Sequence, residues 1–244
     1  MKNKIHLSLI VPAYNEEKRL PNTLGEIDNY LSGQDYDYEI IVVSDGSKDR
    51  TVEVVNDLSS RIKNLRVIDI KGNYGKGYST RLGLAEGRGK YRVFTDADNS
   101  TPIKEIEKMW GPFKEGFDIV IGSRDIKGAV LDPPQPLFRR VLGDVFRVLA
   151  QIICGTWGIL DTQCGFKGFT EEVVENVFPK CKINRFAFDP EILVIAKRMG
   201  YKTKEVPIYW KNDLESKVKF KSVLKMFRDL FKIRWNLITR KYKI

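Results

Sequence analysis

Asp96 and Asp98, which flank Ala97, have the residue types and the spacing of a metal site. They directly follow Tyr91–Thr95, an apolar run that predicts a buried strand. Two carboxylates at the end of a strand can share a hard cation such as Mg²⁺ or Mn²⁺, whose other ligands are diphosphate oxygens and water. The alternative is a solvated acidic turn before a helix, because a Thr-Pro pair typical of helix starts follows at residue 101.

Two further polar turns also follow apolar runs. The turn at 44–49 contains Asp45, which could accept hydrogen bonds from a base or a ribose, and Asp49, whose position favours capping of the next helix. The glycine-rich turn at 73–77 carries Lys76, which either contacts a phosphate or lies in solvent. This turn is neither a Walker A loop nor a dinucleotide-binding fingerprint, because glycines that those motifs require are missing from it.

The elements that would position these turns alternate between strand and helix patterns. Such alternation over short spacings predicts βαβ units, a mostly parallel sheet and an α/β fold. Loops at the carboxyl ends of parallel strands build the ligand crevice, so the turns at 12–16, 44–49, 96–99 and 123–124 are expected along one edge. The expected strands are Leu7–Val11, Glu39–Val43, Leu65–Ile70, Tyr91–Thr95 and Phe117–Gly122. The expected helices are Glu16–Leu31, Asp49–Ile62 and Lys76–Glu86.

The second half of the chain has a less regular pattern and no internal repeat. Three prolines predict a loop over Gly128–Pro136. The patterns that follow predict the helices Leu137–Cys154, Pro190–Met199 and Phe220–Arg240 and the strands Thr162–Phe169 and Lys204–Tyr209.

Composition and charge narrow the classes of protein. The 244 residues are 42% hydrophobic and 30% charged, which suits a globular core and excludes a disordered chain or a disulfide scaffold. Three cysteines and one histidine argue against zinc sites and histidine-dependent triads. The net charge of +10 is concentrated in residues 196–244, which hold 15 Lys or Arg against 4 Asp or Glu. This excess predicts an anionic surface as partner for the C-terminal segment.

The order of the motifs resembles the GT-A fold of family 2 inverting glycosyltransferases. The sequences that carry this resemblance are PAYNE at 12–16, SDGSKD at 44–49 and DAD at 96–98. Farther along, GSR at 122–124, DTQCGFK at 161–167, RFAFD at 185–189 and VP at 206–207 resemble the dolichyl-phosphate β-glucosyltransferases within that family. The resemblance extends from about Leu7 to Trp235, which is nearly the whole chain.

The resemblance implies a fold, a domain organisation and a reaction. The fold is a Rossmann-like GT-A domain over residues 1–215, with a nucleotide-sugar half at about 1–125 and an acceptor half at about 126–215. A basic amphipathic helix follows at 216–244. The implied reaction transfers a hexose, glucose from UDP-glucose, to a dolichyl or polyprenyl phosphate with inversion. GDP-mannose as donor and a sugar or protein hydroxyl as acceptor stay open.

The resemblance also implies roles for single residues. The nucleotide-sugar site would comprise Pro12, Ala13, Tyr14, Glu16, Asp45, Lys76, Asp96, Ala97 and Asp98, with Asp96 and Asp98 holding Mg²⁺ or Mn²⁺. The acceptor site would comprise Arg124, Arg139, Gln163 and Lys167. The catalytic group would comprise Arg124, Arg139 and Asp189, with Asp189 either positioning a ligand, acting as a base or only capping a helix. Ser44 departs from the family pattern, in which an aspartate is usual.

The helix predicted at Phe220–Arg240 is expected to lie on an anionic membrane. Apolar residues at helical spacing lie on one side of this helix, and basic residues occupy the rest of its surface. Trp235 adds an interfacial aromatic side chain. The enzyme would then attach peripherally to the cytoplasmic face of a membrane. The alternative is a helix that packs this stripe on the catalytic domain. A nucleic-acid-binding protein is the rival suggested by charge, but the basic segment is not part of a recognised DNA- or RNA-binding module.

Overall fold

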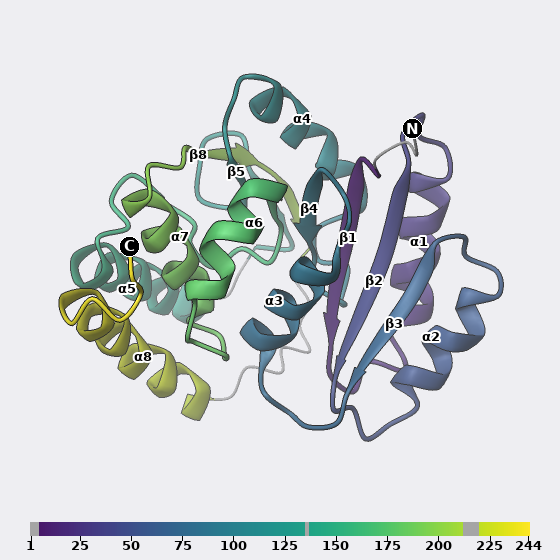
Figure 1. Cartoon of the computed structure of the whole chain (residues 1–244), viewed down its shortest axis with the longest axis horizontal. Helices are drawn as coiled ribbons and strands as arrows, with labels where there is room; N and C mark the ends of the chain where they lie inside the picture. The colour runs from purple at the N-terminus through teal and green to yellow at the C-terminus, as the bar shows by residue number, and fades with distance from the viewer. Residues whose placement is uncertain (1–4, 135–136, 212–219) are drawn as a thin grey trace.

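A seven-stranded sheet forms the centre of the protein in the computed structural model (Figure 1). The structure describes residues 5–134, 137–211 and 220–244, and the side chains within these ranges except those of residues 137–140 and 220–223. The strands are β1 (Leu7–Ala13), β2 (Tyr38–Asp45), β3 (Leu65–Ile70), β4 (Tyr91–Phe94), β5 (Ile119–Ser123), β7 (Lys167–Thr170) and β8 (Thr203–Pro207). Their order in the sheet is β3-β2-β1-β4-β7-β5-β8.

The sheet is mostly parallel, as the alternating pattern predicts. β1 pairs in parallel with β2 and β4, β2 with β3, and β5 with β8, whereas β7 runs antiparallel between β4 and β5. All seven residues of β1 are buried, which is typical of a parallel strand covered on both faces. The carboxyl ends of β1, β2 and β4 therefore lie at one edge of the sheet, where the polar turns follow.

Helices flank the sheet (Figure 1). They are α1 (Leu20–Leu31), α2 (Thr51–Ser59), α3 (Lys76–Glu86), α4 (Glu107–Lys114), α5 (Leu137–Cys154), α6 (Glu171–Val177), α7 (Phe188–Arg198) and α8 (Phe220–Ile238). α3 packs closely on β1 and β2 because Gly83 faces the sheet. A Cβ atom at Gly83 would lie 2.6 Å from Ile10 and 2.8 Å from Val43, so the close contact requires glycine there.

Several expected boundaries differ from the structure. α1 begins at Leu20 rather than Glu16, because the preceding residues form a turn bonded to the loop after β2. The strand expected from Thr162 begins only at Lys167. The loop expected over Gly128–Pro136 contains the short strand β6 (Val130–Asp132), which pairs in parallel with β9 (Tyr209–Lys211).

α8 packs on α5 and does not stand apart from the body of the protein. The rings of Phe146 and Phe227 lie 5.6 Å apart, and Leu230, Ile233 and Leu237 of α8 are buried. The apolar residues expected on a single side of this helix therefore lie on two sides, since Leu230 is buried. The domain boundary expected near residue 216 falls within 212–219, outside the described residues.

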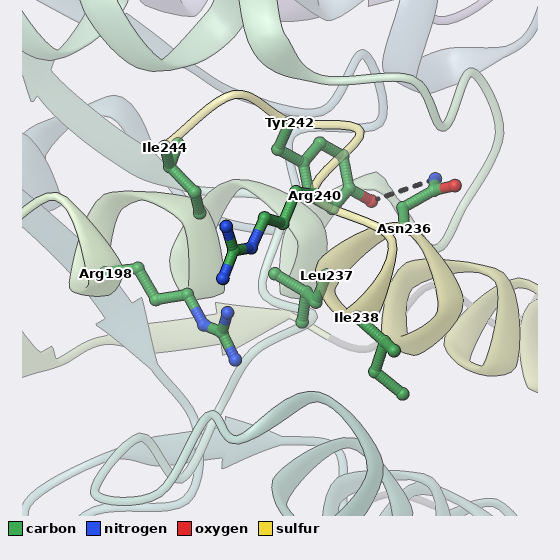
Figure 2. Close-up of a pocket in the computed structure, with 7 residues that line it drawn as sticks. All are labelled: Arg198, Asn236, Leu237, Ile238, Arg240, Tyr242 and Ile244. Carbon is green, nitrogen blue, oxygen red and sulfur yellow. Dashed lines mark hydrogen bonds between the residues drawn. The ribbon is translucent and has the colours of Figure 1, made fainter.

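The segment after α8 folds back onto α7. Tyr242 donates a 2.7 Å hydrogen bond to the carboxylate of Glu191 and accepts one from the amide of Asn236, as Figure 2 shows for the latter pair. Glu191 also accepts hydrogen bonds from the backbone amides of Lys182 and Ile183. This buried network fixes the end of α8. Across the described residues, no helix has both the length and the hydropathy needed to cross a membrane.

Candidate active site

The loops after β1 and β2 are joined by side-chain hydrogen bonds. The amide of Asn15 donates to Ser47 Oγ at 3.1 Å, and the Asn15 side-chain oxygen accepts from the amide of Lys48 at 2.8 Å. The amide of Glu16 donates to Thr51 Oγ1 at 2.9 Å. The two turns expected along one edge are thus held together as a single rim.

This rim contains several residues expected to line the nucleotide pocket. Pro12 and Ala13 form the buried end of β1, paired with the end of β2. Tyr14 follows with 38% of its surface exposed, which leaves its ring available to a ligand. The carboxylate of Glu16 lies 3.8 Å from Nε of Arg19.

Asp45 shapes the glycine-rich turn. Its two carboxylate oxygens accept hydrogen bonds from the amides of Tyr74 at 2.9 Å and Gly75 at 2.7 Å. Gly75 has a φ of 109°, a conformation that favours glycine. Asp45 therefore orients the turn that presents Lys76, and its contact with a nucleotide stays a prediction.

Asp49 is not itself the N-cap residue of α2, which is Arg50, but it lies directly before that residue. Its carboxylate accepts a 3.0 Å hydrogen bond from the amide of Thr51, the first residue of α2. A second oxygen accepts from the amide of Glu17 at 3.2 Å. Asp49 is thus part of the framework of the rim.

Asp96 lies beyond β4 between a cation and a glycine. The ammonium of Lys76 lies 2.5 Å from Asp96 Oδ1. On the other side, a Cβ atom built at Gly165 would overlap the Asp96 carboxylate. Burial alone would lower the pKa of Lys76, but the charges of Asp96 and Asp189 raise it. Lys76 therefore lies against the acidic pair and not free in solvent.

Asp98 lies close enough to Asp96 for the charge of Asp96 to act on it. Burial raises the pKa of Asp98, and the nearby charge of Asp96 raises it further. Its Oδ1 accepts a 3.0 Å hydrogen bond from the amide of Ser100, while the carbonyl of Ala97 accepts one from Thr23 at 2.8 Å. These backbone contacts fix the turn and leave two mutually repelling carboxylates side by side.

The donor set fits a divalent cation that is only partly coordinated by protein. The described residues contain no group of three or more His, Cys, Asp or Glu side chains placed to hold a metal ion. Asp96 and Asp98 can nevertheless supply two hard oxygen ligands, and Mg²⁺ is commonly bound by one or two carboxylates plus phosphates and water. The ammonium of Lys76 on Asp96 shows that this position already attracts positive charge.

Asp189 meets this cluster from α7. It is 4% exposed, and its Oδ1 accepts a 2.6 Å hydrogen bond from Lys167 Nζ. Burial raises the pKa of Asp189, although the charges of Lys167 and Lys76 oppose the rise. Capping is not its role, because Ala187 is the N-cap residue of α7 and Asp189 lies within the first turn.

Lys167 differs from the expectation that it contacts an acceptor. The side chain is 1% exposed, and its ammonium bonds both the carbonyl of Cys164 and Asp189. It also lies 5.4 Å from the centre of the Phe94 ring. A buried ammonium with these partners orients Asp189 and cannot reach a ligand in solvent.

Arg124 is held by a carboxylate that the sequence does not single out. Asp161, 3% exposed, accepts hydrogen bonds from Arg124 Nε at 2.7 Å, from Arg124 Nη2 at 2.9 Å and from the Arg124 backbone amide at 3.0 Å. Burial would raise the pKa of Asp161, but the Arg124 guanidinium lowers it. This fork ties the end of β5 to the 161–166 turn, so part of the Arg124 donor capacity serves the fold.

Of the other two expected acceptor residues, the structure describes the side chain of Gln163 but not that of Arg139. Gln163 lies in the same turn, and its buried Nε2 atom has no hydrogen-bond partner among the described residues. A buried donor without a partner is costly, so a bound group that accepts from it would be stabilised. Arg139 lies in the first turns of α5, and its side chain is outside the described part of the chain.

The sequence motifs predict where this site lies better than they predict the role of each residue in it. The DTQCGFK motif does lie beside the acidic pair, as Gly165 shows. Its Asp161 and Gly165 were not expected to matter individually. Their functions depend on partners 37 and 69 positions away in the sequence, which no local pattern reveals.

Comparison with known proteins gives close relatives over the whole chain. A dolichyl-phosphate β-glucosyltransferase of Trichomonas vaginalis is 38% identical over 99% of this chain and 79% of its own length. The dolichyl-phosphate β-glucosyltransferase of Homo sapiens is 36% identical over 98% of this chain and 78% of its own length.

Solved structures share the fold at lower identity. Glucosyl-3-phosphoglycerate synthase from Mycobacterium tuberculosis, in complex with Mn²⁺, UDP and glucosyl-3-phosphoglycerate, superposes with a TM-score of 0.71 at 18% identity. The alignment covers 99% of this chain and 81% of that one. TarS 1–349 from S. aureus aligns with a TM-score of 0.59 at 17% identity, over 97% of this chain and 73% of that one. The GT-A fold expected from the motifs is confirmed.

The glycosyl transferase family 2 domain matches residues 8–178. This range begins in β1, passes through the acidic pair and includes Lys167, so it covers the residues that build the rim and most of the charged cluster. Because the match spans more than half of the sequence and the relatives above extend it to the C-terminal helix, this chain is a glycosyltransferase that belongs to glycosyl transferase family 2.

Proposed function

We propose that this enzyme transfers glucose from UDP-glucose to dolichyl phosphate with inversion at the sugar carbon, releasing UDP. The observation that supports this most directly is the convergence of Asp96, Asp98, Lys76 and Asp189 at the strand edge of a chain whose relatives carry this activity in their names. Such a cluster can bind a diphosphate with its cation at the point where the leaving group forms.

The reaction is a single displacement. A phosphate oxygen of the acceptor forms a bond to sugar C1 while the bond between C1 and the UDP oxygen breaks, and its electron pair leaves with UDP. A divalent cation on Asp96 and Asp98 would neutralise the charge that develops on the diphosphate. Lys76 adds a second positive charge at Asp96. A diphosphate beside Asp96 therefore meets both charges.

A phosphate acceptor does not require a strong general base. A phosphate monoester is largely ionised at neutral pH because its second pKa is about 6. The acceptor therefore needs cations and hydrogen-bond donors to hold it. Gln163 offers a buried donor with no partner among the described residues, and the predictions that Arg124 and Arg139 contact the acceptor phosphate belong to this model. Asp189, engaged with Lys167, then acts by position and not as a base.

A donor screen tests this function. Purified protein is given dolichyl phosphate in detergent with UDP-glucose or GDP-mannose, and released nucleotide and lipid-linked sugar are measured. We expect glucosyl-lipid from UDP-glucose. Preference for GDP-mannose, or transfer only to a sugar hydroxyl, would overturn the assignment. Unchanged rates in Arg124→Ala, Arg139→Ala and Asp189→Asn together would overturn the phosphate-acceptor model.

A lipid acceptor also bears on location. A long polyprenyl chain leaves the bilayer at a cost of about 0.8 kcal/mol per CH₂, so the enzyme must meet it at the surface. We propose that α8 attaches the enzyme peripherally to an anionic membrane, on its cytoplasmic face. Exposed basic side chains contribute about 1 kcal/mol each near such a surface, and salt weakens their attraction.

A further inference from the structure

The ion pair with Asp161 uses only part of the Arg124 guanidinium. Nε and Nη2 of Arg124 donate to the Asp161 carboxylate at 2.7 Å and 2.9 Å, which occupies one edge of this planar group. None of the described residues accepts a hydrogen bond from the third nitrogen, Nη1, and the Arg124 side chain keeps 22% of its surface exposed. Arg124 therefore has a second edge that can donate to the oxygens of an anion.

The indole of Trp210 lies against the same guanidinium. Arg124 Cζ lies over the Trp210 ring, 5.4 Å from the ring centre, which is within the range of a cation–π contact. Such a contact restrains a guanidinium without accepting a conventional hydrogen bond from it. Asp161 and Trp210 together therefore restrain Arg124, and its second edge keeps a defined direction.

The strand β9, which carries Trp210, is anchored by the residues on either side of this tryptophan. The amide of Lys211 donates to the carbonyl of Ser100 at 2.7 Å. The amide of Tyr209 donates to the carboxylate of Glu105 at 3.0 Å. Ser100 and Glu105 follow the acidic pair in the chain, so β9 is attached to the segment that begins at the expected cation site.

The side chain of Trp210 is not needed for this attachment. Alternation along β9 places the side chains of Tyr209 and Trp210 on opposite sides of the strand. The Tyr209 hydroxyl donates to Asp132 in β6 at 3.1 Å, whereas Trp210 contacts Arg124. The bonds to the segment after the acidic pair come from backbone amides. Replacement of the indole therefore removes the contact with Arg124 and leaves β9 in place.

Trp210 thus connects the two positions where the proposed reaction needs positive charge. The acidic pair would hold the cation that binds the leaving diphosphate, and Arg124 is expected to hold the attacking phosphate. A displacement at sugar C1 is fast only when the attacking and leaving groups are fixed relative to each other. A rigid contact between β9 and Arg124 supplies part of that fixation.

We infer that Trp210 is a positioning residue, which acts through Arg124 to orient its second edge toward the phosphate of the acceptor. This inference deepens the proposed function and rests on it, since it requires an acceptor with a phosphate group. The alternative is that Trp210 only fills space beside the hydrophobic core, against which it packs. That alternative predicts a loss of stability with no selective effect on the acceptor.

Two substitutions of Trp210 and one control separate these roles. Trp210→Leu removes the ring, whereas Trp210→Phe keeps an aromatic face. Trp110→Leu is the matched control, because Trp110 is also half-buried but packs against His6 and Phe113. Initial rates of transfer to detergent-dispersed dolichyl phosphate give the KM of each substrate. We expect Trp210→Leu to raise the KM for dolichyl phosphate about fivefold, Trp210→Phe to recover most of this loss, and Trp110→Leu to have no effect on it.

The donor side and the dependence on Arg124 supply two further readouts. Isothermal titration of UDP with Mn²⁺ should give the wild-type affinity for Trp210→Leu, because the bonds of β9 to the donor side remain. In a chain that already carries Arg124→Ala, Trp210→Leu should raise the KM for dolichyl phosphate no further, since the two residues act as a unit. Circular dichroism checks the fold of each variant. A wild-type KM in Trp210→Leu, or an equal rise with and without Arg124, would overturn the inference.

The wild type distinguishes this failure from failure of the proposed function. Transfer of glucose to dolichyl phosphate by the wild type, together with an unchanged KM in Trp210→Leu, would overturn the positioning role alone. Transfer by the wild type only to a sugar hydroxyl would overturn the phosphate-acceptor function, and the role of Trp210 would fail with it.

Discussion

Gly165 determines where the Asp96 carboxylate can lie. Any side chain at this position would overlap that carboxylate, since even a Cβ atom would do so. Asp96 could then avoid the clash only by turning away from Asp98 or by shifting the 161–166 turn. The glycine therefore positions a carboxylate that we propose binds the cation.

We predict that Gly165→Ala lowers affinity for Mn²⁺ in the presence of UDP by about tenfold, or about 1.4 kcal/mol, while the protein stays folded. Isothermal titration measures the affinity, and circular dichroism checks the fold. Gly111→Ala is the matched control, since a Cβ at Gly111 in α4 meets no atom within 4 Å and alanine suits a helix. Equal Mn²⁺ affinity in Gly165→Ala and the wild type would contradict the positioning role.

The pair of Lys167 and Asp189 is buried on both sides, with 1% and 4% of each residue exposed. Removing one charge leaves the other without its partner in the interior, which costs about 3–5 kcal/mol. Lys167→Met should therefore destabilise the protein more than the double variant Lys167→Met/Asp189→Leu does. Urea unfolding measures both. A double variant that is less stable than Lys167→Met would show that the unpaired charge of Asp189 is not the cause of the loss.

Single residues differ in how well the sequence predicts them. Asp96 and Asp98 are recognisable because an apolar run ends directly before them, which is a local pattern. Lys167 was expected to face an acceptor, because nothing local shows that its partner lies 22 residues away on another helix. Ion pairs that form across the fold depend on tertiary packing and are not encoded in spacing.

At the level of elements, the Arg124–Asp161 fork joins β5 to the turn that approaches the active site. The fork lowers the pKa of Asp161 in the folded protein below its usual value of 3.8. A carboxylate with a lowered folded pKa stabilises the protein fully above its unfolded pKa. That stabilisation is lost as the pH falls through the folded pKa.

We therefore predict that Asp161→Asn is about 3 kcal/mol less stable than the wild type at pH 7, since it leaves a partly buried guanidinium without its charge partner. The difference in free energy of unfolding should begin to shrink as the pH falls below about 4, where the unfolded carboxylate takes up a proton, and should disappear below the lowered pKa of the folded protein. Urea unfolding at a series of pH values measures it. A difference that stays constant down to low pH would mean that the ion pair is not the cause.

The central strands were predictable because each contains a continuous run of apolar residues. β3, α3 and α5 have the bounds that their patterns predict. β6 and β9 were missed as a pair, because three-residue strands in a proline-rich region carry too little periodicity. The sequence also did not predict that α8 has apolar residues on both a buried and an exposed side. Apolar residues of the two sides cannot be told apart in the sequence.

For the whole molecule, the basic C-terminal segment was evident from charge alone, but its geometry was not. Composition shows 15 basic residues after residue 195. It does not show that α8 lies on α5, or that α5 exposes apolar side chains of its own. The packing of α8 on α5 and the exposure of the α5 side chains therefore follow from tertiary structure and not from composition.

We propose that the acidic pair after β4 supports glucose transfer to a lipid phosphate through a bound cation. The most direct measurement is formation of glucosyl-lipid from UDP-glucose and dolichyl phosphate by wild type and Asp98→Ala, with Mn²⁺ and with excess EDTA. We expect lipid product and UDP in equal amounts from the wild type with Mn²⁺. EDTA should stop the reaction, and Asp98→Ala should lower turnover by about 100-fold or more with the fold intact. Undiminished transfer in EDTA, or by Asp98→Ala, would contradict the claim.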